Sequence, residues 1–230
     1  MNSAERKTWL DLSGAILFFG SAGLMLFSPA MFIPHPDVQM IAAILIMPAF
    51  FLTTVFITTF LYRRGSIRAD LKLTSPGVKD LLPAGLGILI AILFMVVTAL
   101  KNHFWYDTPP QLLVEYAKDC PSYVFYIILI FAGFLAPVSE ELVYRCIYFE
   151  WCKQNLPDKK FLHYLLPSFL FAISHGFVWQ SFLLFFLALI LQWFQVNGST
   201  TRAILIHAVF NWCSLSLLIL VRSGLIQMSE

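Results

Sequence analysis

The sequence predicts an all-α protein, a polytopic transmembrane helical bundle with about seven spans. Two observations lead to this fold class. Hydrophobic residues make up 59% of the 230 residues and charged residues only 12%, a composition that is foreign to soluble globular domains. The apolar residues also fall into long runs, and about 20 of them in a helix cross roughly 30 Å of hydrocarbon.

Seven apolar runs are candidates for the membrane spans. They lie at residues 10–33, 40–62, 82–100, 122–152, 161–178, 180–196 and 201–221. The first run follows Arg6 and Lys7, as the core of a signal peptide would, but it is long and lacks a small-residue cleavage pattern, so we interpret it as a retained span. The runs leave no room for a soluble domain, and residues 1–230 are therefore expected to form a single membrane domain.

The distribution of Lys and Arg predicts the orientation of the bundle, because cytoplasmic loops collect these residues. An N-terminus in the cytoplasm leaves only Lys101, Lys118 and Arg222 on the outer side. The basic residues on the cytoplasmic side would be Arg6, Lys7, Arg63, Arg64, Arg68, Lys72, Lys79, Lys153, Lys159, Lys160 and Arg202. Since topology accounts for these charges and no basic patch is interleaved with aromatic residues, no nucleic-acid partner is expected.

Three charged side chains occur inside the fourth run, in the segment SEELVYR. A charge at this depth costs several kcal/mol, so it indicates a functional site by default. Glu141 and Arg145 are four residues apart on one helical face and are expected to form an ion pair that supports the helix. Glu140 lacks this partner, and it is either a carboxylate turned to water or a lipid headgroup, or a general base whose burial suits it to accept a proton.

A proline lies just before these carboxylates. Pro137 removes one backbone hydrogen bond and frees the carbonyl four residues back, that of Gly133. We therefore expect the helix to kink or restart at Pro137, and a restart near Ser139 would bring the carboxylates close to the positive end of a helix dipole.

Two later helices contribute further polar residues. His175 follows Phe171 by one turn in FAISH, and His207 and Asn211 share one face in HAVFN. A single membrane histidine is more often a contact between helices, but a carboxylate pair, two histidines and an asparagine on three helices favour a shared polar site. A Glu with a His can take a proton from water, while a His and an Asn can stabilise an oxyanion. This set is typical of a hydrolase that uses activated water.

The three segments APVSEELVYR, FAISH and HAVFN resemble the EExxxR, FxxxH and HxxxN motifs of the CPBP intramembrane proteases. This family includes the CAAX prenyl endopeptidases and bacterial relatives tied to bacteriocin self-protection. The resemblance covers about residues 120–221, a CPBP-like catalytic core. It implies an intramembrane endopeptidase that acts on a peptide or a membrane-anchored protein in the lipid bilayer, an integral multi-pass membrane location, and no nucleic acid.

The same resemblance assigns roles to individual residues. It implies that Glu140 and His175 activate the water and that His207 and Asn211 form the oxyanion site. Glu141 with Arg145 would then support the helix structurally. Cys146 departs from the family pattern, because a glycine or another small residue often follows the arginine of the motif.

The metal requirement is the main alternative within this reading. Glu140, His175 and His207 could supply the two-histidine, one-carboxylate set that suits a catalytic zinc, but the sequence has no HExxH motif. We favour a glutamic-type protease without a cofactor over a metalloprotease. The four cysteines lack metal-ligand spacing and are expected to be free apolar fillers; they are Cys120, Cys146, Cys152 and Cys213.

Two other classes of function compete with proteolysis. A catalytically silent membrane scaffold or immunity protein would bind a peptide or partner in the same bundle. A proton-coupled transporter also uses intramembrane Glu and His, but the polar residues all lie in the second half of the chain, and no pair of inverted halves is evident.

Overall fold

The computed structural model describes residues 3–26, 32–62, 71–106, 112–176 and 179–226, and these residues contain helices and connections without a β-strand. Within these described ranges, five helices are long and apolar enough to cross a membrane: Pro36–Ile57, Val78–Phe104, Ser122–Asn155, Trp179–Val196 and Thr200–Arg222. The prediction of an all-α, multi-pass membrane bundle is confirmed.

The two remaining expected spans correspond to helices outside this set of five. The run at 10–33 overlaps α1 (Ser3–Leu26), and the run at 161–178 overlaps α9 (Lys160–Ile173). With 14 residues, α9 is only about 21 Å long at 1.5 Å per residue, which is shorter than the hydrocarbon layer. Its end is set by Gly176, whose φ of +94° is a left-handed conformation that stops the helix within an apolar run.

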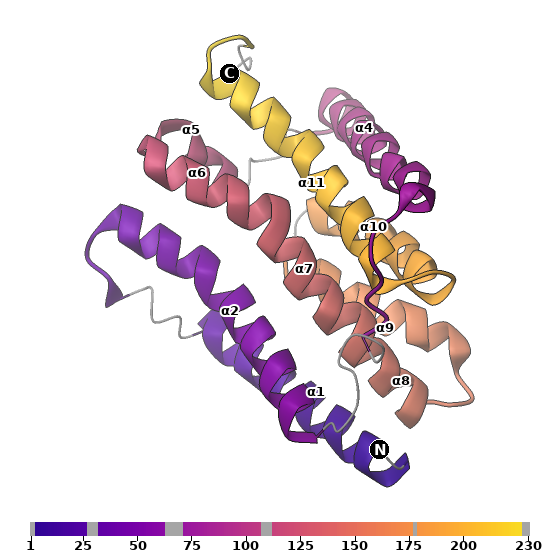
Figure 1. The fold of residues 1–230 in the computed structure, drawn as a ribbon. Coiled ribbons are helices and arrows are strands. Elements are labelled where there is room, and N and C mark those ends of the chain that lie inside the picture. The colour runs from indigo at the N-terminus through magenta and orange to yellow at the C-terminus, as the bar shows by residue number, and fades with distance from the viewer. Residues whose placement is uncertain (1–2, 27–31, 63–70, 107–111, 177–178, 227–230) are drawn as a thin grey trace.

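One long helical segment, Ser122–Asn155, runs diagonally through the bundle (Figure 1). It contains two π-helical stretches, and its parts are α6 (Ser122–Ile130), η3 (Phe131–Leu135), α7 (Ala136–Glu141), η4 (Leu142–Tyr148) and α8 (Phe149–Asn155). The predicted restart near Ser139 is wrong, because the backbone stays helical through Leu135 and Leu142. The disturbance lies before Pro137 instead, where the N–H of Ala136 donates to the carbonyl of Phe131, five residues back.

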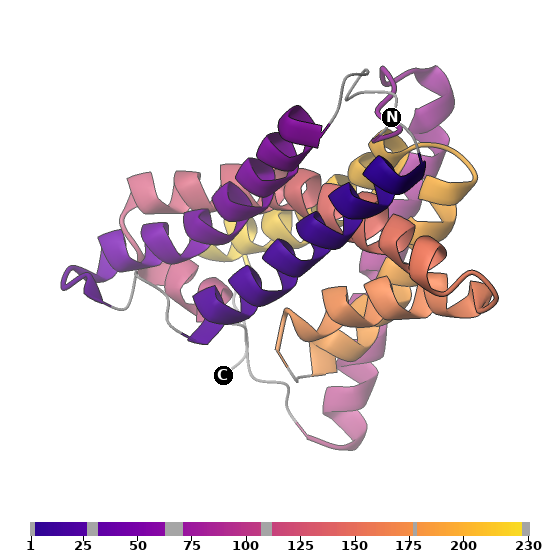
Figure 2. The same cartoon turned by 90° about the horizontal axis from the view of Figure 1, so that it is seen from below.

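The other helices surround this segment. Helix α2 (Pro36–Tyr62) packs against α1 and α7, and α11 (Thr200–Arg222) lies on the opposite side. Helix α4 (Leu81–Phe104) packs on α11, while α10 (Trp179–Val196) contacts both α9 and α11 (Figures 1 and 2). A short helix, α5 (Leu112–Asp119), precedes α6 and also contacts α11.

Helix α11 runs antiparallel to the central helix and approaches it closely. A Cβ atom added at Gly133 would lie 2.6 Å from the indole of Trp212, and farther along, the thiol of Cys146 lies 3.2 Å from the hydroxyl of Thr200. On its other side α11 meets α4 at Gly87, where an added Cβ would lie 2.5 Å from the carbonyl oxygen of Ile206, next to His207. Glycine at these two points lets the helix that carries HAVFN sit tightly between its neighbours.

Both ends of α11 are tied down by polar contacts. At the C-terminal end, the Arg222 guanidinium donates to the carbonyls of Ala117, Lys118 and Cys120, with the first at 2.6 Å, and lies 4.4 Å from the ring centre of Phe125. These contacts hold the turn between α5 and α6 against α11.

At the N-terminal end of α11, residues 71–77 form a segment that we call the strap. The hydroxyl of Thr201 donates to the carbonyl of Thr74 and accepts from the N–H of Thr74, both at 2.9 Å. The N–H of Thr200 donates to the carbonyl of Lys72 at 3.2 Å. The strap therefore satisfies part of the first turn of α11, whose N–H groups have no partner within the helix.

Candidate active site

Glu141 is the centre of a buried cluster of charges. Its carboxylate is completely buried, with Oε2 3.0 Å from Nε of Arg145 and Oε1 3.0 Å from Nδ1 of His207. The ion pair with Arg145 that the spacing predicted is present, and it joins residues one turn apart in the central helix. The contact with His207 links this helix to α11.

Arg145 is held by charge and by an aromatic face. None of its three guanidinium nitrogens has an aligned hydrogen-bond acceptor among the described residues, so the 3.0 Å approach to Glu141 is an ionic contact without hydrogen-bond geometry. The guanidinium carbon also lies 5.0 Å from the ring centre of Phe171, within cation–π range. A fully buried cation with so few partners depends strongly on the one carboxylate beside it.

His207 lies between two carboxylates. Its Nδ1 is hydrogen bonded to Glu141, while Nε2 lies 3.7 Å from Oε2 of Glu140, too far for a direct hydrogen bond. Because an ionised carboxylate can only accept, Nδ1 is assigned as a donor. Glu140 thus faces His207 although it lacks an ion pair within its own helix, and 19% of its side chain remains exposed.

Phe171 connects the second motif to this cluster. Its fully buried ring lies 5.6 Å from the ring of His207, 4.8 Å from that of His175 and 5.4 Å from that of Tyr144, measured between ring centres. The sequence placed Phe171 one turn before His175, but its position between the two histidines depends on how α9 and α11 are placed and was not foreseen.

His175 stands at the end of α9, directly before the left-handed Gly176. Its Nδ1 lies 2.9 Å from the carbonyl of Phe171 and therefore donates, which leaves Nε2 of a neutral ring as an acceptor. Among the described residues, His175 forms no hydrogen bond or ion pair with Glu140. In the described contacts Glu140 faces His207 and His175 packs on Phe171, whose ring lies against His207, so the expected water-activating pair is linked only indirectly.

Asn211 lies one turn after His207 on α11. Its Nδ2 donates to the carbonyl of Ala132 in η3 at 2.7 Å, so one of its two amide N–H bonds is already used. The other N–H is the group that an oxyanion role requires. No pattern in the sequence indicated Ala132, although its carbonyl lies five residues before a proline.

The alternative to a metal-free site is a metal held by Glu140, His175 and His207. In the part of the chain that the structure describes, no three His, Cys, Asp or Glu side chains are grouped so as to hold an ion. Nδ1 of His207 is engaged with Glu141 and Nδ1 of His175 with a backbone carbonyl, contacts that the second nitrogen of a zinc-bound histidine also makes. The metal-free mechanism therefore stays a prediction. The four cysteines are free.

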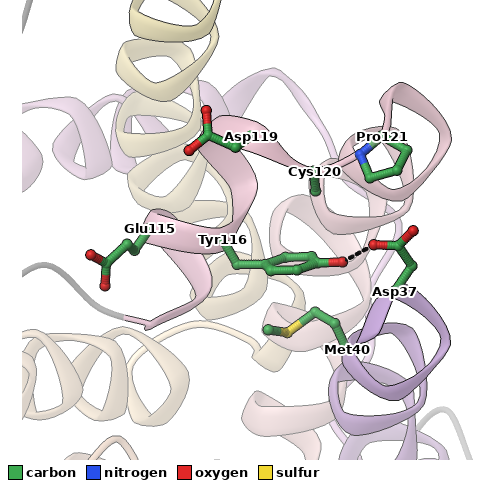
Figure 3. Close-up of a pocket in the computed structure, with 7 residues that line it drawn as sticks. All are labelled: Asp37, Met40, Glu115, Tyr116, Asp119, Cys120 and Pro121. Atoms are coloured by element: carbon green, nitrogen blue, oxygen red, sulfur yellow. Dashed lines mark hydrogen bonds between the residues drawn. The ribbon is translucent and has the colours of Figure 1, made fainter. Parts of the chain in front are cut away.

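A cavity lies away from this cluster, where α5 meets the start of α2 (Figure 3). Its volume is about 530 Å³, and it is lined by Asp37, Met40, Glu115, Tyr116, Asp119, Cys120 and Pro121. The hydroxyl of Tyr116 donates to Asp37, and burial together with this carboxylate raises the pKa of Tyr116 to about 12. The cavity contains none of the residues that the motifs indicated.

The comparison with known families agrees with the motifs. Residues 122–213 match the family model described as Type II CAAX prenyl endopeptidase Rce1-like. No curated protein and no solved structure matches the chain. The matched segment contains the two glutamates, the arginine, both histidines and the asparagine of the cluster. The resemblance to the CPBP intramembrane proteases is thereby confirmed for residues 122–213, which are similar to the CAAX prenyl endopeptidases that this model describes.

Proposed function

We propose that this protein is an intramembrane endopeptidase that hydrolyses a peptide bond of a membrane-associated protein or peptide. The family match supports protease activity in general. The observation that carries the proposal is His207 held between Glu141 and Glu140 inside a membrane bundle. A scaffold has no need for such a costly group of charges at this depth.

In the proposed reaction Glu140 is the general base. Its carboxylate takes a proton from water, and the oxygen of that water forms a bond to the carbon of the scissile carbonyl. The proton then passes to the leaving amine as the C–N bond breaks, which regenerates the carboxylate. Nε2 of His175 is an acceptor that can help to orient the water, since its Nδ1–H is fixed on a backbone carbonyl.

His207 and Asn211 are proposed to stabilise the oxyanion. An oxyanion role requires a proton on Nε2 of His207 as well as the one that Nδ1 donates to Glu141, and the carboxylates near both ring nitrogens favour this form. An Nε2–H of this kind and the second N–H of Asn211 are the donors that a tetrahedral intermediate needs. Glu141 and Arg145 act by orientation, because Glu141 accepts from Nδ1 of His207 and Arg145 neutralises Glu141.

The test uses purified protein in liposomes and internally quenched peptides that end in Cys-a-a-X, in farnesylated and unmodified forms, together with a single-span membrane peptide. Wild type is expected to cleave at least one probe, and Glu140→Gln is expected to be slower by about 10² to 10⁴. Folding of the variant is checked by circular dichroism. Equal cleavage by Glu140→Gln would refute the general-base role, and failure of wild type on all three probes would count against proteolysis.

A further inference from the structure

The π turn η3 changes which carbonyl Pro137 leaves free. Because the N–H of Ala136 donates to Phe131, the hydrogen-bond register here joins residues five apart. In this register the carbonyl of Ala132 would receive the N–H of residue 137. Proline has none, so Ala132 is left without a backbone donor. In an ordinary α-helix the freed carbonyl would be that of Gly133, as the sequence predicted.

The amide of Asn211 takes the place of this missing donor. Its Nδ2 lies 2.7 Å from the carbonyl oxygen of Ala132. The adjacent Gly133 makes the contact possible, because an added Cβ there would lie only 2.6 Å from Trp212, next to Asn211 on α11. Figure 1 shows α11 running beside the central helix at this level. The Asn211 side chain thus reaches the free carbonyl of Ala132 at a point where α11 closely approaches the central helix.

We propose that Pro137 is a positioning residue for Asn211. Because proline has no backbone N–H, the carbonyl of Ala132 is free to accept a hydrogen bond from the Asn211 amide. This hydrogen bond fixes the direction of the second amide N–H of Asn211. This inference rests on the proposed function, in which that N–H binds the oxyanion. The terminal torsion of an asparagine is otherwise broad, and a donor contributes to catalysis only when it is already aimed at the developing charge.

The decisive change is Pro137→Ala, which restores a backbone N–H that competes for the carbonyl of Ala132. Loss of a full oxyanion donor costs about 10² to 10³ in kcat, and a misdirected donor is expected to cost about 10 to 100. KM for the peptide probe is expected to stay within about twofold. The melting temperature should not fall, because alanine is a better helix residue than proline. A merely structural proline would instead lower stability and leave kcat unchanged.

Pro48→Ala is the matched control, since Pro48 is also buried inside a membrane helix, α2. It is expected to keep wild-type kcat. A second measurement follows Asn211 without cleavage: in protein labelled with ¹⁵N-asparagine, the side-chain amide signals of Asn211 should shift in Pro137→Ala. The amide of Asn197, which donates to the carbonyl of Trp193 at 2.9 Å, should not shift.

The two measurements separate the inference from the proposed function. An unchanged Asn211 signal, or an unchanged kcat in Pro137→Ala, would overturn the positioning role. If wild type cleaves none of the probes, proteolysis fails as the function, while the Asn211 signal still decides whether Pro137 orients this amide.

Discussion

Arg145→Ala tests whether the buried ion pair holds the site together. The substitution leaves the carboxylate of Glu141 completely buried, with the N–H of His207 as its remaining partner. Stranding one member of a buried pair costs about 3 to 5 kcal/mol of unfolding free energy. The lost contact of the guanidinium with Phe171 places the expected value in the upper part of that range.

The same helix supplies a matched control. Lys153 and Glu150 form an ion pair at 2.9 Å in which the lysine side chain is 46% exposed, so Lys153→Ala is expected to cost at most about 1 kcal/mol. The assay is reversible unfolding in mixed micelles, followed by circular dichroism as denaturing detergent is added. Adding Glu141→Gln to Arg145→Ala should recover part of the loss, because the stranded charge is then gone.

A loss for Arg145→Ala no larger than that of Lys153→Ala would refute the structural role. Normal stability together with abolished cleavage would move Arg145 into the group that contacts the substrate.

Three further predictions follow from the site and the topology. Gly176→Ala places a side chain at φ +94° and should lower cleavage at least tenfold, because the strain displaces His175. The control is Gly224→Ala, at φ +75° beyond the end of α11, which should lower only stability. Equal losses of activity in the two variants would contradict this prediction. Cleavage should survive prolonged chelation; zinc found in near-stoichiometric amount by elemental analysis, with activity lost on its removal and restored by its return, would establish a metalloprotease. An N-terminal tag should resist protease added to intact cells, and its digestion would reverse the predicted orientation.

The helical bundle could be predicted from the sequence because the length and the apolar composition of a run decide by themselves whether the run can cross a membrane. It predicted the partners of Glu141 only within its own helix, where the spacing to Arg145 is fixed by the α-helical repeat. The end of α9 was missed because Gly176 adopts a left-handed conformation inside an apolar run. The π turn before Pro137 was missed for a different reason: it is matched to Asn211, 79 residues away, and no local pattern records such a contact.

The strap limits where this protein can be cut into fragments or joined to a relative in a chimera. A fragment limited to the family-matching residues 122–213 would keep the motifs but lose the strap that caps the first turn of α11. It would also lose α4, which packs against α11 at Gly87, and the end of α11 with Arg222. Chimeras that exchange N-terminal halves between relatives should therefore keep everything from residue 71 onward with the catalytic half, and place their junction in or before the connection that follows α2.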